Sequence, residues 1–393
     1  MKAVTYLQDF FARDDINVKR QKNIDYAKTI SICFMILIHV FMYPEYMELE
    51  TSTFGRIIDY YMGGFMAAPI FMACMGVGLA YSKHNDSNSI IKRGIKLFVL
   101  AYILNILRCL VAVTYMCATN CYGAETLNHI IFDFFQGDIL HFAGLALILF
   151  GLIKKFKHYK IILPIFALVC SIICTAIPAQ YIDNDAILYT VGLIFPIGRL
   201  TKEVDEIICC FPLMSWFIVV IAGYCFALVL RKVKNLDKFY SRCMIIGLIL
   251  AVPLITCEVV FDFGEMGRSS TELQAYMKTF YDFVFSFGFM LFDFGVLHYF
   301  TKITSDKLNK LNYRISNAIN EIYCFSWILI LNGPYFIICY IKYPTPEVTE
   351  AVKIWVYFLI FIGITVVSMI LGICLKEYKT KRQHKKIAVA NKK

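Results

Sequence analysis

The sequence has few charged residues: Asp, Glu, Lys and Arg make up 17% of its 393 residues, against about a quarter in soluble globular domains. Hydrophobic residues make up 59%, and the mean hydropathy is +0.63. A composition displaced this far towards lipid excludes a disordered chain, a small disulfide-stapled domain and an ordinary cytosolic enzyme. It indicates an integral membrane protein with several spans.

The sequence also lacks an internal repeat, a low-complexity tract and a cleavable signal peptide. The first apolar run is followed by Met-Tyr-Pro-Glu-Tyr, which has no small-x-small cleavage site, so we expect this run to be retained. The 15 cysteines show no metal-binding spacing with histidines, and no metal is expected. Only Cys117 and Cys121 are placed for a disulfide, and the alternative is that both are free thiols, since the odd number of cysteines already requires free thiols.

Ten apolar runs approach or exceed the roughly 20 residues that a membrane-spanning helix needs. We therefore predict an all-α fold: a polytopic integral membrane protein of about ten transmembrane helices. The longest linkers lie at 118–137 and 179–206, so we expect one membrane domain over 24–375, between an N-terminal arm (1–23) and a basic tail (376–393). The runs cover residues 24–44, 57–81, 94–117, 138–153, 161–178, 207–230, 241–261, 279–301, 315–341 and 353–375.

The basic residues are distributed unevenly between the two sides of the predicted membrane domain. If the chain starts inside, thirty of the 39 Lys and Arg residues fall in the arm, the tail and the cytoplasmic loops. This positive-inside pattern predicts that both termini are cytoplasmic. The net charge of +10 is then a matter of orientation and of contact with lipid headgroups, and nucleic acid is not an expected partner.

Ionisable residues in the first apolar run are the clearest candidates for function, because charged groups inside a bilayer cost several kcal/mol or more. Asp25, Lys28 and His39 fall within an arc of about 60° on one helix face. We expect an ion pair between Asp25 and Lys28. His39 suits a general base, because imidazole exchanges a proton near neutral pH. The alternative is an interfacial histidine bonded to a carbonyl or a lipid headgroup.

Further polar residues lie inside later runs, so the chain is expected to enclose a polar cavity or route, as a transporter or an enzyme does. We expect Arg108 to pair with one of the embedded carboxylates, and the sequence does not show which one. Asp138 and His141 open the fourth run. The remaining embedded polar residues are Asn105, Glu258, Asp282, Asp293, Glu321 and Asn332.

A basic cluster at the start of the third run is a candidate anion site. Lys92, Arg93 and Lys96 lie at the beginning of a predicted helix, whose N-terminal amides also favour anions. The cluster is suited to the phosphates of a nucleotide-bearing donor. The alternative is that these residues only follow the positive-inside rule.

The order of several short motifs resembles the membrane acyltransferase 3 superfamily, to which the bacterial relatives of heparan-α-glucosaminide N-acetyltransferase are related. The first-helix signature Asn-Ile-Asp25-Tyr-Ala-Lys28 ends ten residues later in His39. The chain departs from the family at Lys28, where Arg is usual, at Thr29 in place of Gly, and at His141 in place of the commoner Gln. Further matching segments are Pro69–Gly78, Lys92–Leu97, Asp138–Leu145 and Ile322-Tyr323, whereas the late Tyr-x-x-His reads Tyr323-Cys-Phe-Ser326.

The resemblance implies acyl transfer from a cytoplasmic acyl-CoA, acetyl-CoA above all, to a hydroxyl or amine of a glycan or other cell-envelope acceptor. It implies that His39 is the general base or acyl relay, and that Asp25 and Lys28 hold the donor end of the first helix. The expected location is the cell membrane. The alternatives are a transporter or flippase that uses the buried charges as a substrate or proton pathway, and, more distantly, a sensor or scaffold. The other implied roles are CoA phosphate binding by Lys92, Arg93 and Lys96, and cavity lining by Arg108, Asp138 and His141.

Overall fold

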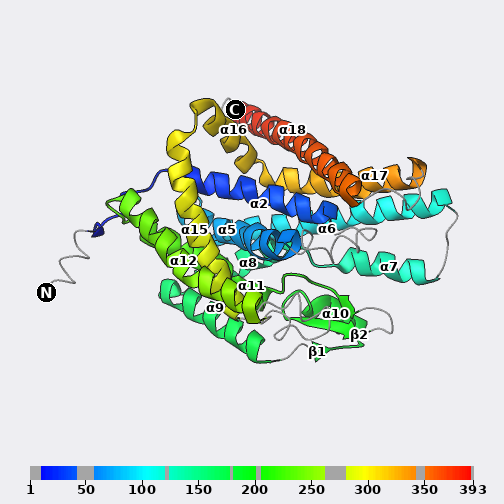
Figure 1. The fold of residues 1–393 in the computed structure, drawn as a ribbon, viewed down its shortest axis with the longest axis horizontal. Helices are drawn as coiled ribbons and strands as arrows, with labels where there is room; N and C mark the ends of the chain where they lie inside the picture. The colour runs from blue at the N-terminus through cyan, green and yellow to red at the C-terminus, as the bar shows by residue number, and fades with distance from the viewer. Residues whose placement is uncertain are drawn as a thin grey trace. The chain divides into compact units, whose positions relative to one another are not determined.

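The computed structural model describes residues 10–41, 57–119, 124–177, 180–200, 205–261, 280–341 and 350–390. Each of the ten apolar runs coincides with a helix or a helical pair (Figure 1), which confirms the all-α, polytopic membrane fold. These helices are α2 (Lys22–Phe41), η2 (Ile57–Ala67) continuing as α5 (Ala68–Tyr81), α6 (Ser87–Thr119), α8 (Ile139–Ile153), α9 (Tyr159–Ala176), α11 (Leu213–Leu230), α12 (Leu236–Phe261), α15 (Phe280–Ile303), α17 (Ile319–Ile341) and α18 (Glu350–Ala390).

Fewer than ten of these helices meet a strict spanning criterion. In the described part of the chain, six segments are long and apolar enough to cross a membrane. Ile139–Ile153 and Ile319–Leu331 are shorter apolar helices. The total of ten spans and the cytoplasmic position of both termini stay predictions. The six segments are Lys22–Phe41, Met62–Tyr81, Tyr159–Ala176, Leu213–Leu230, Asp282–Ile303 and Trp355–Lys385.

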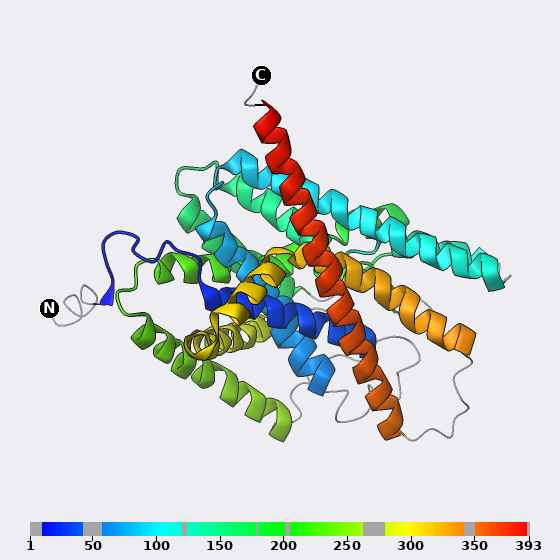
Figure 2. The same cartoon turned by 90° about the horizontal axis from the view of Figure 1, so that it is seen from above.

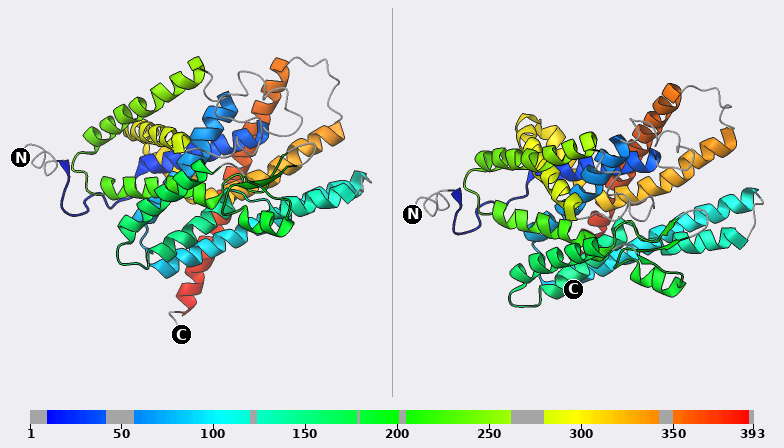
Figure 3. Two further views of the ribbon diagram at one scale, coloured as in Figure 1. Left: turned by 90° about the horizontal axis from the view of Figure 1, so that it is seen from below. Right: turned by 60° about the horizontal axis from the view of Figure 1, so that its bottom comes forward.

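The two long linkers contain regular structure that the apolar pattern did not predict. The first contains α7 (Ala124–Phe135). The second contains β1 (Gln180–Tyr181), α10 (Asp185–Val191), β2 (Ile197–Leu200) and β3 (Asp205–Ile207). In the three-stranded sheet, β2 lies between a parallel β1 and an antiparallel β3 (Figure 3). The apolar residues of this linker are scattered along the sequence and come together in a small core. Its buried members are Leu188, Leu193, Ile197, Ile208 and Cys209.

The chain divides into two compact units. Unit 1 comprises Met1–Arg20 and Met72–His298, and unit 2 comprises Gln21–Phe71 and Tyr299–Lys393. The predicted start of the sixth span at residue 207 is too early, since α11 begins at Leu213 after an irregular stretch. That stretch approaches the start of α8, where the backbone N–H of Gly137 donates to the carbonyl of Ile208 at 2.5 Å.

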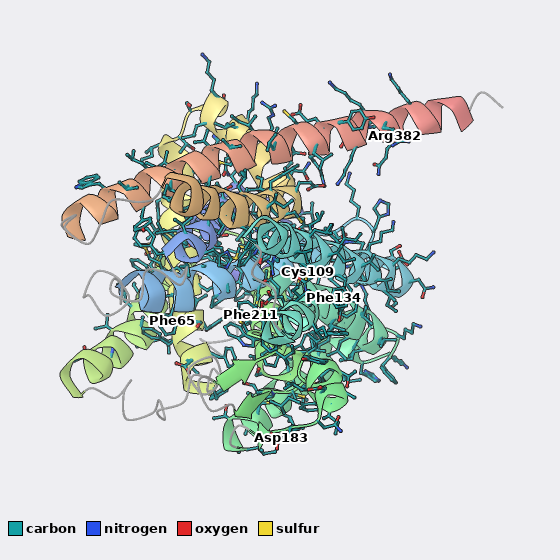
Figure 4. The ribbon with its side chains drawn as sticks, turned by 90° about the vertical axis from the view of Figure 1, so that its right-hand side faces the viewer. Phe65, Cys109, Phe134, Asp183, Phe211 and Arg382 are labelled. Atoms are coloured by element: carbon teal, nitrogen blue, oxygen red, sulfur yellow. The ribbon has the colours of Figure 1, made fainter. Side chains whose placement is uncertain are left out.

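In unit 1, helices α6 and α8 pack closely because glycines face each other. A Cβ atom on Gly144 would lie 2.8 Å from the backbone nitrogen of Phe98, closer than a methyl group tolerates. Helix α6 also lies beside α7 (Figure 4), where the thiol of Cys109 is 3.6 Å from the carbonyl oxygen of Ile130. The start of α8 is therefore held between α6, the end of α7 and the approach to α11.

In unit 2, helix α2 packs against α17, α18 and the shorter α16 (Asp306–Asn317). Helix α18 is one continuous helix of 41 residues (Figure 2), and a Cβ atom on its Gly372 would lie 2.9 Å from the backbone nitrogen of Ile322. The described part of the basic tail therefore extends the last span as helix, and Figure 4 labels Arg382 on this extension.

Candidate functional site

Asp25 lies in the first turn of α2 and is buried in unit 2, with a 6% exposed residue surface. Its carboxylate accepts a 2.8 Å hydrogen bond from the hydroxyl of Ser316 on α16. The next residue, Tyr26, donates its phenolic O–H to the side-chain oxygen of Asn309 at 3.2 Å, again on α16. These bonds join the N-terminal end of α2 to the amphipathic helix α16.

Lys28 is half-buried one turn beyond Asp25. The ion pair predicted between the two residues stays a prediction. The Asp25 carboxylate has a hydroxyl partner on a neighbouring helix, Ser316 of α16. A hydroxyl bond of this kind offsets part of the cost of burying the carboxylate.

His39 lies in the last turn of α2, 14 residues and about 21 Å along the helix from Asp25. Its ring stacks on Trp327 of α17, with centroids 4.2 Å apart and planes tilted by 34°. Tyr323, one turn earlier on α17, meets the imidazole at 6.3 Å with an interplanar angle of 65°. The structure therefore places the predicted base in an aromatic environment, separate from Asp25 and Lys28.

The segment that surrounds His39 includes the late Tyr323-Cys-Phe-Ser326 motif, which lacks the usual histidine. Ser326 is fully buried, and its hydroxyl donates to the carbonyl of Tyr323 at 2.8 Å. This bond is within one turn of helix α17, so Ser326 supports the backbone that carries Tyr323. Trp327 was not among the residues predicted from the sequence, although tryptophan is rare in this chain, which has 3 in total.

The predicted cavity residues of unit 1 do come together. Arg108 of α6 donates to the carboxylate of Asp138 at 2.6 Å, and the two side chains are 11% and 12% exposed. Asp138 is therefore the carboxylate that pairs with Arg108. Asn105, fully buried one turn earlier on α6, donates at 2.9 Å to the carbonyls of both Phe134 and Gln136. Asn105 thereby fixes the backbone that delivers Asp138 to the arginine.

Asp138 and His141 form a capping box at the start of α8. The Asp138 carboxylate accepts from the backbone N–H of Ile139 at 2.5 Å, while Nδ1 of His141 accepts from the backbone N–H of Asp138 at 3.2 Å. His141 is fully buried, and its ring meets the Tyr102 and Phe98 rings edge to face, at 4.6 and 5.6 Å. One aspartate thus neutralises the arginine and also caps a helix.

The basic cluster of Lys92, Arg93 and Lys96 lies exposed on the first turns of α6. Arg93 approaches the Ser82 hydroxyl at 3.4 Å. The N-terminal amides of α6 are less available than expected, because the Asp86 carboxylate accepts from the backbone N–H of Ser89 at 2.8 Å. Hydrogen bonds from Ser89 hold the pKa of Asp86 below its usual value of 3.8. Any anion must therefore bind through the side chains more than through the helix terminus.

One further embedded polar residue, Glu321, pairs with lysines of the last helix. The Glu321 carboxylate accepts a hydrogen bond from Lys379 at 3.2 Å and forms an ion pair with Lys376 at 3.7 Å, a short network between α17 and α18. Over the ranges that the structure describes, no group of three or more His, Cys, Asp or Glu side chains is placed to hold a metal ion. The remaining side chains named from the sequence, those of Cys117, Cys121, Glu258 and Asn332, lie outside what the structure describes.

Comparison with known proteins identifies one family. Neither the curated proteins nor the solved structures contain a significant match to the chain. A family model described as heparan-alpha-glucosaminide N-acetyltransferase, catalytic, matches residues 20–251. This match spans more than half of the sequence, begins before Asp25 and includes His39, the basic cluster and the capping box of α8. The chain therefore belongs to the family of heparan-α-glucosaminide N-acetyltransferase catalytic domains.

Proposed function

We propose that the protein is an acetyltransferase of the cell membrane that moves an acetyl group from cytoplasmic acetyl-CoA to an amine or hydroxyl of a glycan on the opposite side. Membership of the wider membrane acyltransferase 3 superfamily is part of this proposal. The observation that carries it is the position of His39: it closes the first-helix signature within the matched region, and its ring stacks on Trp327 at 4.2 Å.

His39 acts on this proposal as the general base. It takes the proton from the acceptor nitrogen or oxygen as that atom bonds to the acetyl carbon, and the carbon–sulfur bond of the thioester breaks. The proton then leaves on the CoA thiol. The imidazolium formed in between is stabilised by the face of Trp327, because a cation within about 6 Å of an indole ring is attracted by its quadrupole.

The donor is held at the cytoplasmic end on the same proposal. Lys92 and Lys96 are exposed and one turn apart on α6, so both side chains can meet the phosphates of one CoA molecule. Arg93 contributes from the adjacent position. Asp25 acts indirectly, since its bond to Ser316 fixes the N-terminal end of the helix that carries His39. Lys28 keeps a positive charge near that end.

The test is acetyl transfer from radiolabelled acetyl-CoA to glucosamine-containing glycans by the purified full-length protein, with His39→Ala as the variant. We expect at least a hundredfold loss of transfer, the range typical of removing a general base. His158→Ala is the matched control, because His158 is an exposed residue before α9 whose side chain makes no capping bond.

Two results contradict the proposal. One is transfer by His39→Ala at the wild-type rate. The other is substrate-coupled proton flux in proteoliposomes without any acetyl transfer, which supports the transporter alternative.

A further inference from the structure

His141 carries a hydrogen-bond donor whose position is fixed by its own helix. Nδ1 accepts the backbone N–H of Asp138 at 3.2 Å and therefore carries no proton of its own. The neutral imidazole must then carry its proton on Nε2. Nε2 is the ring nitrogen farther from the helix backbone, so its N–H points away from α8. It takes no part in the capping box, which uses Nδ1.

This Nε2 atom has no hydrogen-bond partner among the described residues, although the side chain is fully buried. Buried donors are rarely left in this state in native proteins. Phe98 and Tyr102 flank the ring edge to face. Both rings are half-buried, and Tyr102 also lies against Phe134 at 5.7 Å, so two partly exposed rings lie against the imidazole. A ligand that displaces one of these rings gains access to the Nε2–H of His141.

The charges around His141 indicate what kind of ligand this is. The Arg108 guanidinium is balanced by the Asp138 carboxylate at 2.6 Å, so these two charges cancel beside a neutral imidazole. An anion or a cation here would add an unbalanced charge to a site that is nearly closed to solvent. An uncharged hydroxyl or carbonyl oxygen accepts the Nε2–H bond without that penalty.

We infer that the Nε2–H of His141 is a binding donor for an uncharged oxygen of the sugar acceptor, beside the Arg108–Asp138 pair and next to the Phe98 and Tyr102 rings. This inference rests on the proposed acetyl transfer for the identity of the ligand, and it assigns His141 to the acceptor and not to the CoA donor. His141 is a binding residue in this account and takes no part in proton transfer.

The first experiment measures binding without catalysis. The full-length protein is labelled with ¹⁵N-histidine in detergent micelles, and the Nε2 signal of His141 is assigned among the 7 histidines by its loss in His141→Gln. N-acetylglucosamine, which is uncharged, is the probe. We expect it to shift the His141 Nε2 signal, whereas acetyl-CoA alone leaves the signal in place. A signal that moves only with acetyl-CoA, or with neither compound, overturns the inference.

The second experiment separates a binding role from a structural one. His141→Met removes the donor, and His141→Gln keeps both an acceptor for the capping box and an N–H donor. We expect Met to raise the KM for the glycan acceptor about tenfold at unchanged KM for acetyl-CoA, and Gln to rescue most of that loss. Equal effects on both KM values, or a failure of Gln to rescue, contradict the assignment. Because the probe binds without reacting, the labelled spectrum remains informative even if no acetyl transfer is found.

Discussion

The two candidate histidine sites, His39 half-buried in unit 2 and His141 fully buried in unit 1, are built in opposite ways. His39 in unit 2 has its ring face against Trp327, an environment that stabilises an imidazolium. His141 in unit 1 has Nδ1 committed to the backbone N–H of Asp138, an arrangement that only a neutral ring can make. The first site is suited to accepting a proton, and the second to donating a hydrogen bond without changing charge.

The difference shows that a histidine is assigned a role by what surrounds it and not by its depth in the membrane. At His39, the neighbours on α17 contribute ring faces. At His141, the neighbours contribute a backbone donor and a compensated charge pair. In acyl transfer generally, one group takes the proton and another holds the acceptor.

The largest effect is expected from breaking the charge pair of unit 1. Asp138→Ala leaves the Arg108 guanidinium buried without its carboxylate and removes the cap of α8. The expected loss is about 3–5 kcal/mol for the orphaned charge and about 1 kcal/mol for the cap. Against a total stability of about 5–15 kcal/mol, this greatly reduces the yield of folded protein. Size-exclusion chromatography and Tm in detergent measure it.

The double variant Arg108→Met with Asp138→Asn is the control for this prediction. It removes both charges and keeps a capping side chain, so it is expected to recover most of the lost stability. If Asp138→Ala alone is as stable as the wild type, the pair does not hold the start of α8, and the account of a neutral site at His141 fails with it.

A smaller effect, on rate, is expected from the unit 2 site. Trp327→Leu removes the ring face from His39, and we expect kcat to fall about tenfold, because a desolvated cation–π contact contributes up to about 2 kcal/mol. Trp355→Leu is the matched control, since Trp355 is 67% exposed on α18 of the same unit. Steady-state kinetics with saturating donor separates the two. Equal rates in both variants would show that the stack is only packing.

Long apolar runs made most of the fold predictable, because a spanning helix satisfies its own backbone and needs only a length of apolar sequence. The structure within the two linkers was not predictable in this way. Helix α7 and the sheet around β2 depend on scattered apolar residues such as Leu188 and Ile208, which meet only once the chain has folded. The late start of α11 has the same cause, because Ile208 and Cys209 in the stretch before it belong to this small core.

For the candidate residues, positions on the helices were more predictable than contacts. Asp138 and His141, three residues apart before an apolar run, have the spacing of a capping box, and the structure confirms that they open α8. The partners Ser316 and Trp327 lie about three hundred residues from Asp25 and His39, and no local pattern connects them. The i, i+3 spacing of Asp25 and Lys28 shows that they are close on one helix, but it cannot show a partner such as Ser316 that lies on another helix.

The Ser316 contact predicts a moderate loss of stability in unit 2. Ser316→Ala removes the 2.8 Å bond to the buried Asp25 carboxylate, and we expect the free energy of unfolding to fall by about 1.5 kcal/mol. Thr380→Ala is the control, because the Thr380 hydroxyl is exposed and bonds only the preceding turn of α18. Chemical denaturation in detergent measures both. A Ser316 variant no weaker than the Thr380 variant would mean that Asp25 is held by its other contacts.

The smallest effect is expected at the exposed counterpart of Asp138. Asp86 also accepts a hydrogen bond from a backbone N–H at the start of a helix, that of Ser89. Unlike Asp138, it is fully exposed to solvent, and none of its described contacts is with a buried arginine. Its folded pKa is lowered by the bonds from Ser89, so its contribution to stability is complete above the unfolded value of 3.8 and disappears as the pH falls through the lower folded pKa. Asp86→Ala should therefore unfold slightly more easily than the wild type at neutral pH and match it at the acid end. Tm measured across this pH range tests both limits, and a deficit in Asp86→Ala that persists at the acid end would show that the aspartate acts through packing rather than through its charge.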